Sequence, residues 1–382
     1  MIDTKEGIDL AADLRGRLER VQAEMRKQNV GSLVVYYRGQ HNMLRMDQVF
    51  YLTDFRSLGE AVLLVPREGR PRLIVTPAWD VERAREAAGV SDVRGVAPGE
   101  LVRTVVDSAR ELAQPLAFSG REIMPVATAT AFADAFGAVP ADGGKIIPSV
   151  AARRTPAELE RIERAGAIAD EGFRVLCEVA RAGMREYELA AEVEAAMQAA
   201  GAEDNFGLIA AGDHNVAIRP PSDRRLERGD VIIGEITPMY RGYLAQLCRT
   251  FVLGEPTVIQ REKYDLLIAA LQRGCDVAKP GVPSADIARA VNEVIGGAGY
   301  AEYCRQPYMR TRGHSLGLGA VVPNDLNEDT GPVLETGMTM VIHPNQYLPE
   351  TGYIMLGDTV VIEDDGPRAF TRTPIRLYWR DA

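Results

Sequence analysis

The sequence predicts an α/β domain over residues 1–150, followed by an α+β domain over residues 151–382. In the first part, helical and strand patterns alternate, which is typical of a sheet covered by helices. At the boundary, Thr155-Pro156-Ala157-Glu158 supplies a capping Thr, a Pro in the first turn and a Glu three residues after the cap, so a long helix begins there. In the second part, pairs of helices are followed by runs of strands, which favours an α+β arrangement.

The elements of the first domain follow from periodicity. Leu10, Leu14, Leu18, Val21 and Met25 recur at helical spacing and predict a helix over residues 8–29, which Gly31 ends. Short runs rich in Val, Leu, Ile and Tyr predict strands at 32–37, 61–66 and 72–76. Helical patterns at 78–88, 98–113 and 125–136 alternate with further short apolar strands, so we expect one doubly wound unit.

The second domain is predicted to contain two similar halves. Helices are expected at 156–181 and 186–200, with Gly183 and Gly201 ending them, and strands follow. A second pair of helices is expected near 258–278 and 284–296, and strands with Gly-rich loops follow from Tyr308. This order of elements indicates an internal pseudo-repeat.

Composition narrows the class of protein. The net charge is −10 and no basic cluster is interleaved with aromatic residues, which argues against nucleic-acid binding. No run approaches the roughly 18 apolar residues of a membrane helix. The first ten residues carry acids where a signal peptide would carry a positive patch, so we expect a cytoplasmic protein. The four cysteines are widely spaced and form no CxxC zinc motif.

Residues 228–254 are predicted to form a hairpin that carries two inward polar side chains. The apolar run Val231–Gly234 leads to Glu235, the chain turns at Tyr240-Arg241-Gly242-Tyr243, and the returning strand carries Gln246. The side chains of Glu235 and Gln246 are therefore expected close together. Of the four histidines, His314 lies between glycines and His343 lies at the end of an apolar strand. With Glu235 they form a possible set of two imidazoles and one carboxylate.

Several ordered motifs resemble the pita-bread superfamily of creatinase, aminopeptidase P, prolidase and methionine aminopeptidase. The matching segments extend over about 230 residues and include PPSDRRLERGDVIIGEI, KPGVPSADI, RGHSLGLG, LETGMTMVIHPNQY and GDTVVI. Residues 1–150, with FYLTDF at 50–55, are similar to the N-terminal domain of the creatinase and prolidase branch. The resemblance implies a pita-bread fold for residues 151–382.

The same resemblance indicates that the metal ligands have changed. Metal-dependent members hold two metal ions with two Asp, one His and two Glu, and these positions fall here on Glu235, Gln246, His314, His343 and Gly357. A neutral amide and a missing side chain cannot bridge two cations, so the two-metal site is expected to be absent. The family's proton-shuttling His falls near Ile218, with His214 four residues away, and a further His falls on Val321.

These changes favour a metal-independent hydrolase that acts on the C–N bond, amide or amidine-type, of a small polar substrate, as creatinase does. His314, His343, Glu235 and Gln246 are the predicted catalytic residues, and no cofactor is expected. One alternative is an enzyme with a single divalent metal ion held by His314 and His343 with Glu235 or Gln246. Another alternative is a non-catalytic binding protein with the same fold.

Further residues are expected to bind the substrate. They are Arg56, His214, Tyr243 and Tyr353, which lie in or near the motifs above. The resemblance also implies a homodimer in which the N-terminal domain of one protomer lies near the site of its partner, and Arg56 would then bind a substrate carboxylate there. No nucleic acid and no membrane are expected as partners.

Overall fold

The computed structural model describes residues 9–40, 42–87, 89–137, 141–319, 325–329 and 331–381. It consists of two compact units, Met1–Ala151 and Ala152–Ala382. His41 and Val321 lie outside the described residues. Within the described ranges, no helix combines the length and the apolar character that crossing a membrane requires.

The N-terminal unit is built on a mixed sheet with the strand order β4-β3-β2-β1-β5-β6. Its strands are β1 (Ser32–Tyr37), β2 (Ala61–Pro66), β3 (Arg72–Val75), β4 (Asp92–Gly95), β5 (Leu116–Ser119) and β6 (Ala141–Asp142). Its helices are α1 (Leu10–Lys27), α2 (Gln48–Thr53), α3 (Val81–Ala87), α4 (Leu101–Ala109), α5 (Val126–Phe136) and α6 (Ile146–Ala151). The predicted helices and strands are present, to within a few residues at their ends.

The expectation of a doubly wound sheet is only partly correct. Strand β1 pairs in parallel with β5, but β2 runs antiparallel to both β1 and β3. The short connection at 67–71 explains the β2–β3 pairing, because a parallel crossover needs a dozen or more residues. Asp47 caps α2 by accepting a hydrogen bond from Phe50 N, so the apolar run that follows becomes a short helix.

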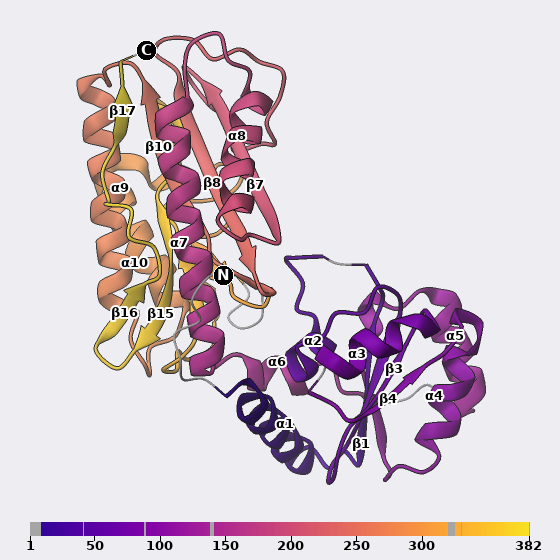
Figure 1. Ribbon diagram of the computed structural model, residues 1–382. Helices are drawn as coiled ribbons and strands as arrows, with labels where there is room; N and C mark the ends of the chain where they lie inside the picture. Colours follow the sequence, from indigo (N-terminus) through magenta and orange to yellow (C-terminus); the bar gives the residue numbers. More distant parts are fainter. Residues whose placement is uncertain are drawn as a thin grey trace. The chain divides into compact units, whose positions relative to one another are not determined.

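The C-terminal unit has the two halves that the order of elements predicted (Figure 1). The first half contains α7 (Pro156–Val179), α8 (Glu186–Ala199), β7 (Asp204–Gly212), β8 (Val231–Tyr240), β9 (Tyr243–Leu244) and β10 (Leu247–Leu253). The second half contains α9 (Val258–Val277), α10 (Ala285–Ile295), β11 (Gly313–Ser315), β12 (Thr339–Ile342), β13 (Gln346–Leu348), β14 (Gly352–Ile354), β15 (Gly357–Glu363) and β16 (Gly366–Ala369). Strand β17 (Tyr378–Arg380) pairs with β10.

The two halves share one sheet, whose order β11-β12-β15-β10-β8-β7 joins them at β10 and β15. Helix α7 begins with the predicted capping box, in which Thr155 and Glu158 bond each other's backbone N–H groups. Helices α7 and α8 pack on one face of β8 and β10, against Ile232, Ile236 and Phe251 among others. The opposite face of these two strands carries the polar side chains described next.

Candidate functional site

A row of polar positions crosses the middle of the C-terminal sheet. Cys248 of β10 pairs with Glu235 of β8 on one side and with Gly357 of β15 on the other. Directly paired residues project from the same sheet face, so these three positions share a face. Ile342 pairs with Asp358, so His343, one residue further along, continues the row beside Gly357. His343 N donates to Arg312 O at 3.0 Å, which extends the ladder to the segment before β11.

We call Glu235, Gln246, Cys248, His314 and His343 the polar row. Gln246 lies two residues before Cys248 and therefore projects from the same face, and its Nε2 donates to Cys248 Sγ at 3.3 Å. His314 pairs with Val341, two residues before His343, and so shares that face as well. Residues that are far apart in the sequence are thus brought together by the sheet.

Glu235 is a partly exposed carboxyl group in the middle of β8, between Leu208 of β7 and Cys248 of β10. Burial among these strands raises its pKa from 4.5 to about 7, and the positive charge of Arg310 opposes the shift only in part. A carboxyl group with this pKa exchanges its proton near neutral pH. It can therefore serve as a general base or acid.

Gln246 and Cys248 form the buried centre of the row. The backbone of Gln246 is fixed by Thr359, whose Oγ1 accepts from Gln246 N at 2.7 Å and donates to Gln246 O at 3.0 Å. Burial raises the pKa of the Cys248 thiol, so the thiol stays protonated. Asn345 Nδ2 lies 4.0 Å from the Cys248 sulfur, and Asn345 Oδ1 accepts from Leu356 N at 3.0 Å.

The two imidazoles lie against each other, with ring centroids 5.5 Å apart and an interplanar angle of 64°. His314 Nδ1 lies 3.1 Å from Ser315 O, which assigns the proton to Nδ1 and leaves Nε2 as the acceptor. Among the described residues His343 Nδ1 has no hydrogen-bond partner. Burial lowers the pKa of both rings, that of His343 to about 3, so both imidazoles are neutral at pH 7.

Gly357 is a glycine because the neighbouring strand approaches too closely for a side chain. A Cβ atom placed there would lie 2.5 Å from His343 Cβ and 2.8 Å from Ile342 O. Both contacts are shorter than packed atoms allow. The position at which the resemblance leads us to expect a Glu is thus closed by the backbone that carries His343.

Arg312 fixes the segment that follows His343. Its guanidinium is fully buried and donates to Asn292 Oδ1 at 2.6 Å, to Asn345 O at 2.9 Å and to Gln346 Oε1 at 2.8 Å. These acceptors are neutral, and burial lowers the pKa of the guanidinium. The side chain therefore links α10 to the backbone between His343 and β13.

The predicted substrate-binding residues lie in different surroundings. Tyr353 of β14 lies near Glu235, since β14 packs against β8. Burial raises the pKa of the Tyr353 phenol, and the negative charge of Glu235 raises it further. His214 Nε2 lies 3.2 Å from Tyr347 Oη. Tyr243 is fully buried, and its hydroxyl donates to Glu158 Oε1 of α7 at 3.3 Å.

Arg56 makes its contacts inside the N-terminal unit. Its Nε lies 3.8 Å from Asp47 Oδ2, and its guanidinium lies 5.0 Å from the ring centroid of Phe50. The described contacts therefore place three of the four predicted substrate-binding residues in the C-terminal unit and Arg56 in the other unit.

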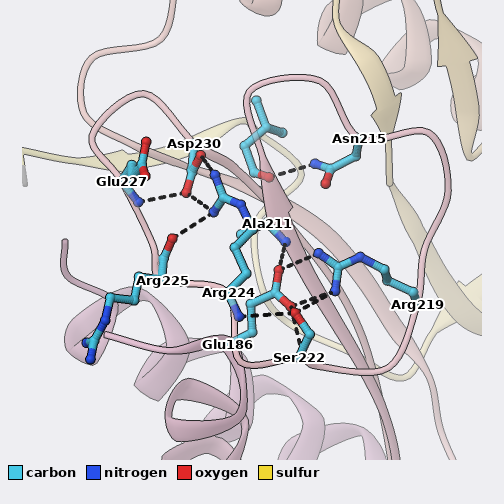
Figure 2. A network of polar contacts seen from close by, with 10 residues as sticks. Glu186, Ala211, Asn215, Arg219, Ser222, Arg224, Arg225, Glu227 and Asp230 are labelled. Carbon is cyan, nitrogen blue, oxygen red and sulfur yellow. Dashed lines mark hydrogen bonds and ion pairs between the residues drawn. The ribbon is translucent and has the colours of Figure 1, made fainter. Parts of the chain in front are cut away.

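A buried ionic network holds the loop that carries His214 (Figure 2). Glu186, at the beginning of α8, is fully buried and accepts from both Nη atoms of Arg219, at 2.6 and 2.7 Å. The same carboxylate accepts from Ser222 N at 2.8 Å and from Ala211 N at 2.9 Å. Figure 2 also shows the bidentate pair of Arg224 with Asp230, at 2.5 and 2.8 Å. The loop between β7 and β8 is thereby attached to α8 and to both strands.

Sequence reasoning did not identify Cys248, Asn345 or Arg310 as parts of the site. The i, i+2 spacing of Gln246 and Cys248 on one strand was an available signal for Cys248. Asn345 and Arg310 lie in irregular segments, where no periodicity indicates the direction of a side chain.

The family resemblance implies divalent metal ions, so we compared the residues present with that requirement. Over the part of the chain that the structure describes, no three His, Cys, Asp or Glu side chains are arranged to hold a metal ion. The set of Glu235, His314 and His343 expected in the single-metal alternative therefore does not meet this geometry. Bridging carboxylates are also missing, since Gln246 is neutral and Gly357 has no side chain. The residues present do not fit a two-metal centre.

Comparison with known proteins identifies relatives of both units. The model of metallopeptidase family M24 matches residues 160–364, and that of the creatinase/prolidase N-terminal domain matches residues 17–150. An Xaa-Pro dipeptidase from Pyrococcus furiosus is 34% identical over 227 residues, which cover 59% of this chain and 64% of that protein. The match thus spans less than two thirds of that relative. The protein named probable dipeptidase PepE from Mycobacterium tuberculosis is 28% identical over 331 residues, 82% of this chain and 84% of its own.

A solved structure has the same fold. Prolidase from Pyrococcus furiosus superposes with a TM-score of 0.80 and 26% identity, over 92% of this chain and 99% of that one. The prediction of an α/β N-terminal domain followed by a pita-bread domain is therefore confirmed.

The comparisons also correct the expectation that no cofactor is needed. The matched family is a family of metallopeptidases, which contradicts that expectation. The expectation rested on two positions alone, Gln246 and Gly357, and the requirement of a family for metal does not depend on these two side chains alone.

Proposed function

We propose that this chain, which belongs to metallopeptidase family M24, hydrolyses the amide C–N bond of a small peptide at the polar row. The proposal rests on one observation. The side chains of Glu235, Gln246, His314 and His343 project from the same face of the sheet, although they come from separate strands and a strand end. The relatives named Xaa-Pro dipeptidases support a small peptide as the substrate.

Glu235 is the proposed proton acceptor. Amide hydrolysis requires that the attacking water loses a proton and that the leaving nitrogen gains one, and a group with a pKa near 7 can transfer the proton from one to the other. Burial gives Glu235 a pKa of about 7. The carboxylate would take the proton of the water as the C–O bond forms, and then give it to the amine as the C–N bond breaks.

The two histidines act as neutral polar groups. His314 holds its Nδ1 proton toward Ser315 O, so its Nε2 can accept a hydrogen bond from a substrate N–H or from water. His343 Nδ1 is a buried ring atom to which no described residue gives a hydrogen bond, and leaving it unpaired is costly unless a ligand satisfies it. The amide of Gln246, held toward Cys248, would orient the substrate carbonyl.

We also propose that the metal site of the family is degenerate in this chain. The donor set does not fit two bridged ions, so no step of the proposed reaction is routed through a metal. Elemental analysis of the purified protein tests this directly. Two equivalents of tightly bound divalent metal would contradict it, and fewer than two are expected.

The activity test uses a panel of dipeptides, including Xaa-Pro dipeptides, with ninhydrin detection of the released amine. Glu235→Gln should reduce kcat by 10²-fold or more, the lower range for loss of a general base. Glu192→Gln is the matched control, because it makes the same change at an exposed position of α8. If no peptide is cleaved and His314→Ala leaves peptide binding unchanged, the chain is a non-catalytic protein of this fold and the proposal fails.

The assembly belongs to the same proposal. We expect a homodimer in which the N-terminal domain of each protomer lies near the partner's site, as in the creatinase and prolidase branch, and we expect it to act in the cytoplasm. Light scattering after gel filtration tests the dimer. In a dimer of this kind, Arg56→Ala should raise KM for substrates with a free carboxylate, and an unchanged KM would remove Arg56 from the site.

A further inference from the structure

Beside the polar row, side chains from three distant segments form an aromatic cluster, which we call the aromatic shelf. Its members are His214, Tyr303, Tyr308 and Tyr347. The rings of Tyr308 and Tyr347 are stacked, with centroids 5.4 Å apart and an interplanar angle of 22°. Tyr303 lies 4.8 Å from Tyr308, and His214 lies 5.6 Å from Tyr347 in an edge-on arrangement.

The shelf is partly exposed to solvent, and hydrogen bonds and an ion pair fix two of its members. Tyr308 is 40% exposed, and His214 is exposed as well. The hydroxyl of Tyr347 is engaged by His214 Nε2 at 3.2 Å, and the loop of His214 is attached by the network of Glu186 and Arg219. A surface fixed in this way loses little side-chain entropy when a ligand packs on it.

The shelf is continuous with the polar row. Tyr347 of β13 pairs directly with Tyr353 of β14, so the two side chains project from the same face of this ribbon. Strand β14 packs against β8, which carries Glu235. Tyr347 also follows His343 by four residues, and Arg312 fixes the intervening segment. Tyr353 thus has Tyr347 as its strand partner and Glu235 as a charged neighbour, and this links the shelf to the polar row.

We propose that the aromatic shelf is a specificity subsite that binds an aromatic or large aliphatic side chain of the substrate. The proposal rests on the proposed function, and it narrows the substrate to small peptides with such a side chain next to the cleaved bond. Stacked tyrosine faces offer flat apolar area, on which a ring packs favourably. A lysine side chain is the weaker ligand, because it offers no flat apolar face to pack on the rings and its ammonium group must stay hydrated.

Kinetics with matched dipeptides test the subsite. Phe-Ala and Ala-Phe are compared with Ala-Ala and with Lys-Ala, so that either side of the bond can carry the large side chain. The wild-type protein should prefer one phenylalanine peptide over both Ala-Ala and Lys-Ala. Tyr308→Ala should raise the KM for that peptide, relative to the KM for Ala-Ala, roughly 3- to 10-fold, the value of one aromatic contact.

Two further variants separate a subsite from a structural role. Tyr308→Phe keeps the ring and should restore the preference, whereas a loss of preference in this variant would contradict packing on the ring face. Tyr187→Ala removes a tyrosine of α8 that is 48% exposed and should change nothing. A preference for Lys-Ala, or equal KM values in the wild type and Tyr308→Ala, would overturn the proposal.

Calorimetric titration with N-acetyl-phenylalanine amide and N-acetyl-alanine amide tests the shelf without turnover. Tighter binding of the phenylalanine amide, lost in Tyr308→Ala, supports the subsite even if no peptide is cleaved, in which case only the proposed function fails. Hydrolysis without any side-chain preference, together with equal binding of the two amides, leaves the proposed function standing and removes the subsite.

Discussion

Replacing Glu235 by Gln should stabilise the protein at alkaline pH. Burial raises the pKa of the carboxyl group from 4.5 to about 7, so the folded protein holds this proton more tightly than the unfolded chain does. The stability contributed by this proton is fully present below pH 4.5 and is lost as the pH rises through about 7. Gln is nearly isosteric with Glu and does not titrate, so the Glu235→Gln variant does not lose this stability as the pH rises.

The expected size follows from the shift. At 1.36 kcal/mol for each pKa unit, a rise from 4.5 to about 7 corresponds to roughly 3 kcal/mol. Because the side chain is partly exposed, we treat this value as the upper end. We compare the difference in free energy of unfolding between Glu235→Gln and the wild type at two pH values. Between pH 4.5 and pH 8 this difference should change by about 1–3 kcal/mol in favour of Glu235→Gln.

Urea denaturation followed by circular dichroism between pH 4.5 and 8.5 measures this difference. The protein is first dialysed against a chelator, so that no cation stabilises the carboxylate. Glu192→Gln, at an exposed position, should follow the wild type at every pH. A difference between Glu235→Gln and wild type that does not change with pH would refute the pKa argument, and a wild type that gains stability relative to Glu235→Gln as the pH rises would reverse its sign.

Other predictions follow from the same contacts. The logarithm of kcat/KM should rise with pH to a plateau above about 7, because the proton acceptor must be ionised, and a profile without this limb would exclude Glu235 from that role. Glu186→Gln should lower the free energy of unfolding by about 2 kcal/mol at pH 7, because Arg219 loses its ionic partner while remaining partly solvated, and urea denaturation measures this. The pKa of Glu186 is lowered, since burial is outweighed by the hydrogen bonds from Arg219 and Ser222, so this contribution is present above pH 4.5 and should fade as the pH falls through the lowered value. Arg312→Met should also destabilise, by about 2–3 kcal/mol, because Asn292 Oδ1 and Gln346 Oε1 lose their donor, and limited proteolysis should then cut near β13.

The sequence was sufficient for elements whose signals are local. The capping box at Thr155 and Glu158, together with the apolar spacing that follows, located the beginning of α7. The order of elements also predicted two halves, which meet in the sheet at the pairing of Cys248 with Gly357. In the N-terminal unit, the expectation of a doubly wound sheet left out the antiparallel pairing of β2, because an apolar run has the same pattern in parallel and antiparallel surroundings.

The site was predictable only in part. Glu235, His314 and His343 were identified from their places in motifs, and the register of the strands puts them on one face of the sheet. The direction in which Tyr243 points was not predictable, because a turn has no period, and its hydroxyl faces Glu158 of α7. The aromatic shelf was not visible either, since its members become neighbours only when three separate loops and strands converge.

Gly357 lies where β15 approaches the end of β12 too closely for a side chain. A Cβ at this position would meet His343 Cα at 2.9 Å and Ile342 O at 2.8 Å, so the obstacle is the backbone of the neighbouring strand. Gly357→Ala should therefore cost about 1–3 kcal/mol in the free energy of unfolding, the range for overpacking, although the same change at an uncrowded position stabilises. Gly366→Ala would be confounded by its φ of 134°, so the matched control is Gly16→Ala in α1, where a Cβ meets nothing within 4 Å.

His343→Gly would remove only one of the colliding atoms, the Cβ, and leave the Ile342 carbonyl in place. The double variant Gly357→Ala with His343→Gly should therefore remain less stable than His343→Gly alone, by chemical denaturation. If the double variant instead regains the stability of His343→Gly, the side chain alone closes the position and the strands can accept a carboxylate. If it does not, the backbone at the end of β12 closes the position whatever side chain stands at residue 343, and side-chain substitutions at these two positions cannot recreate a bridging ligand.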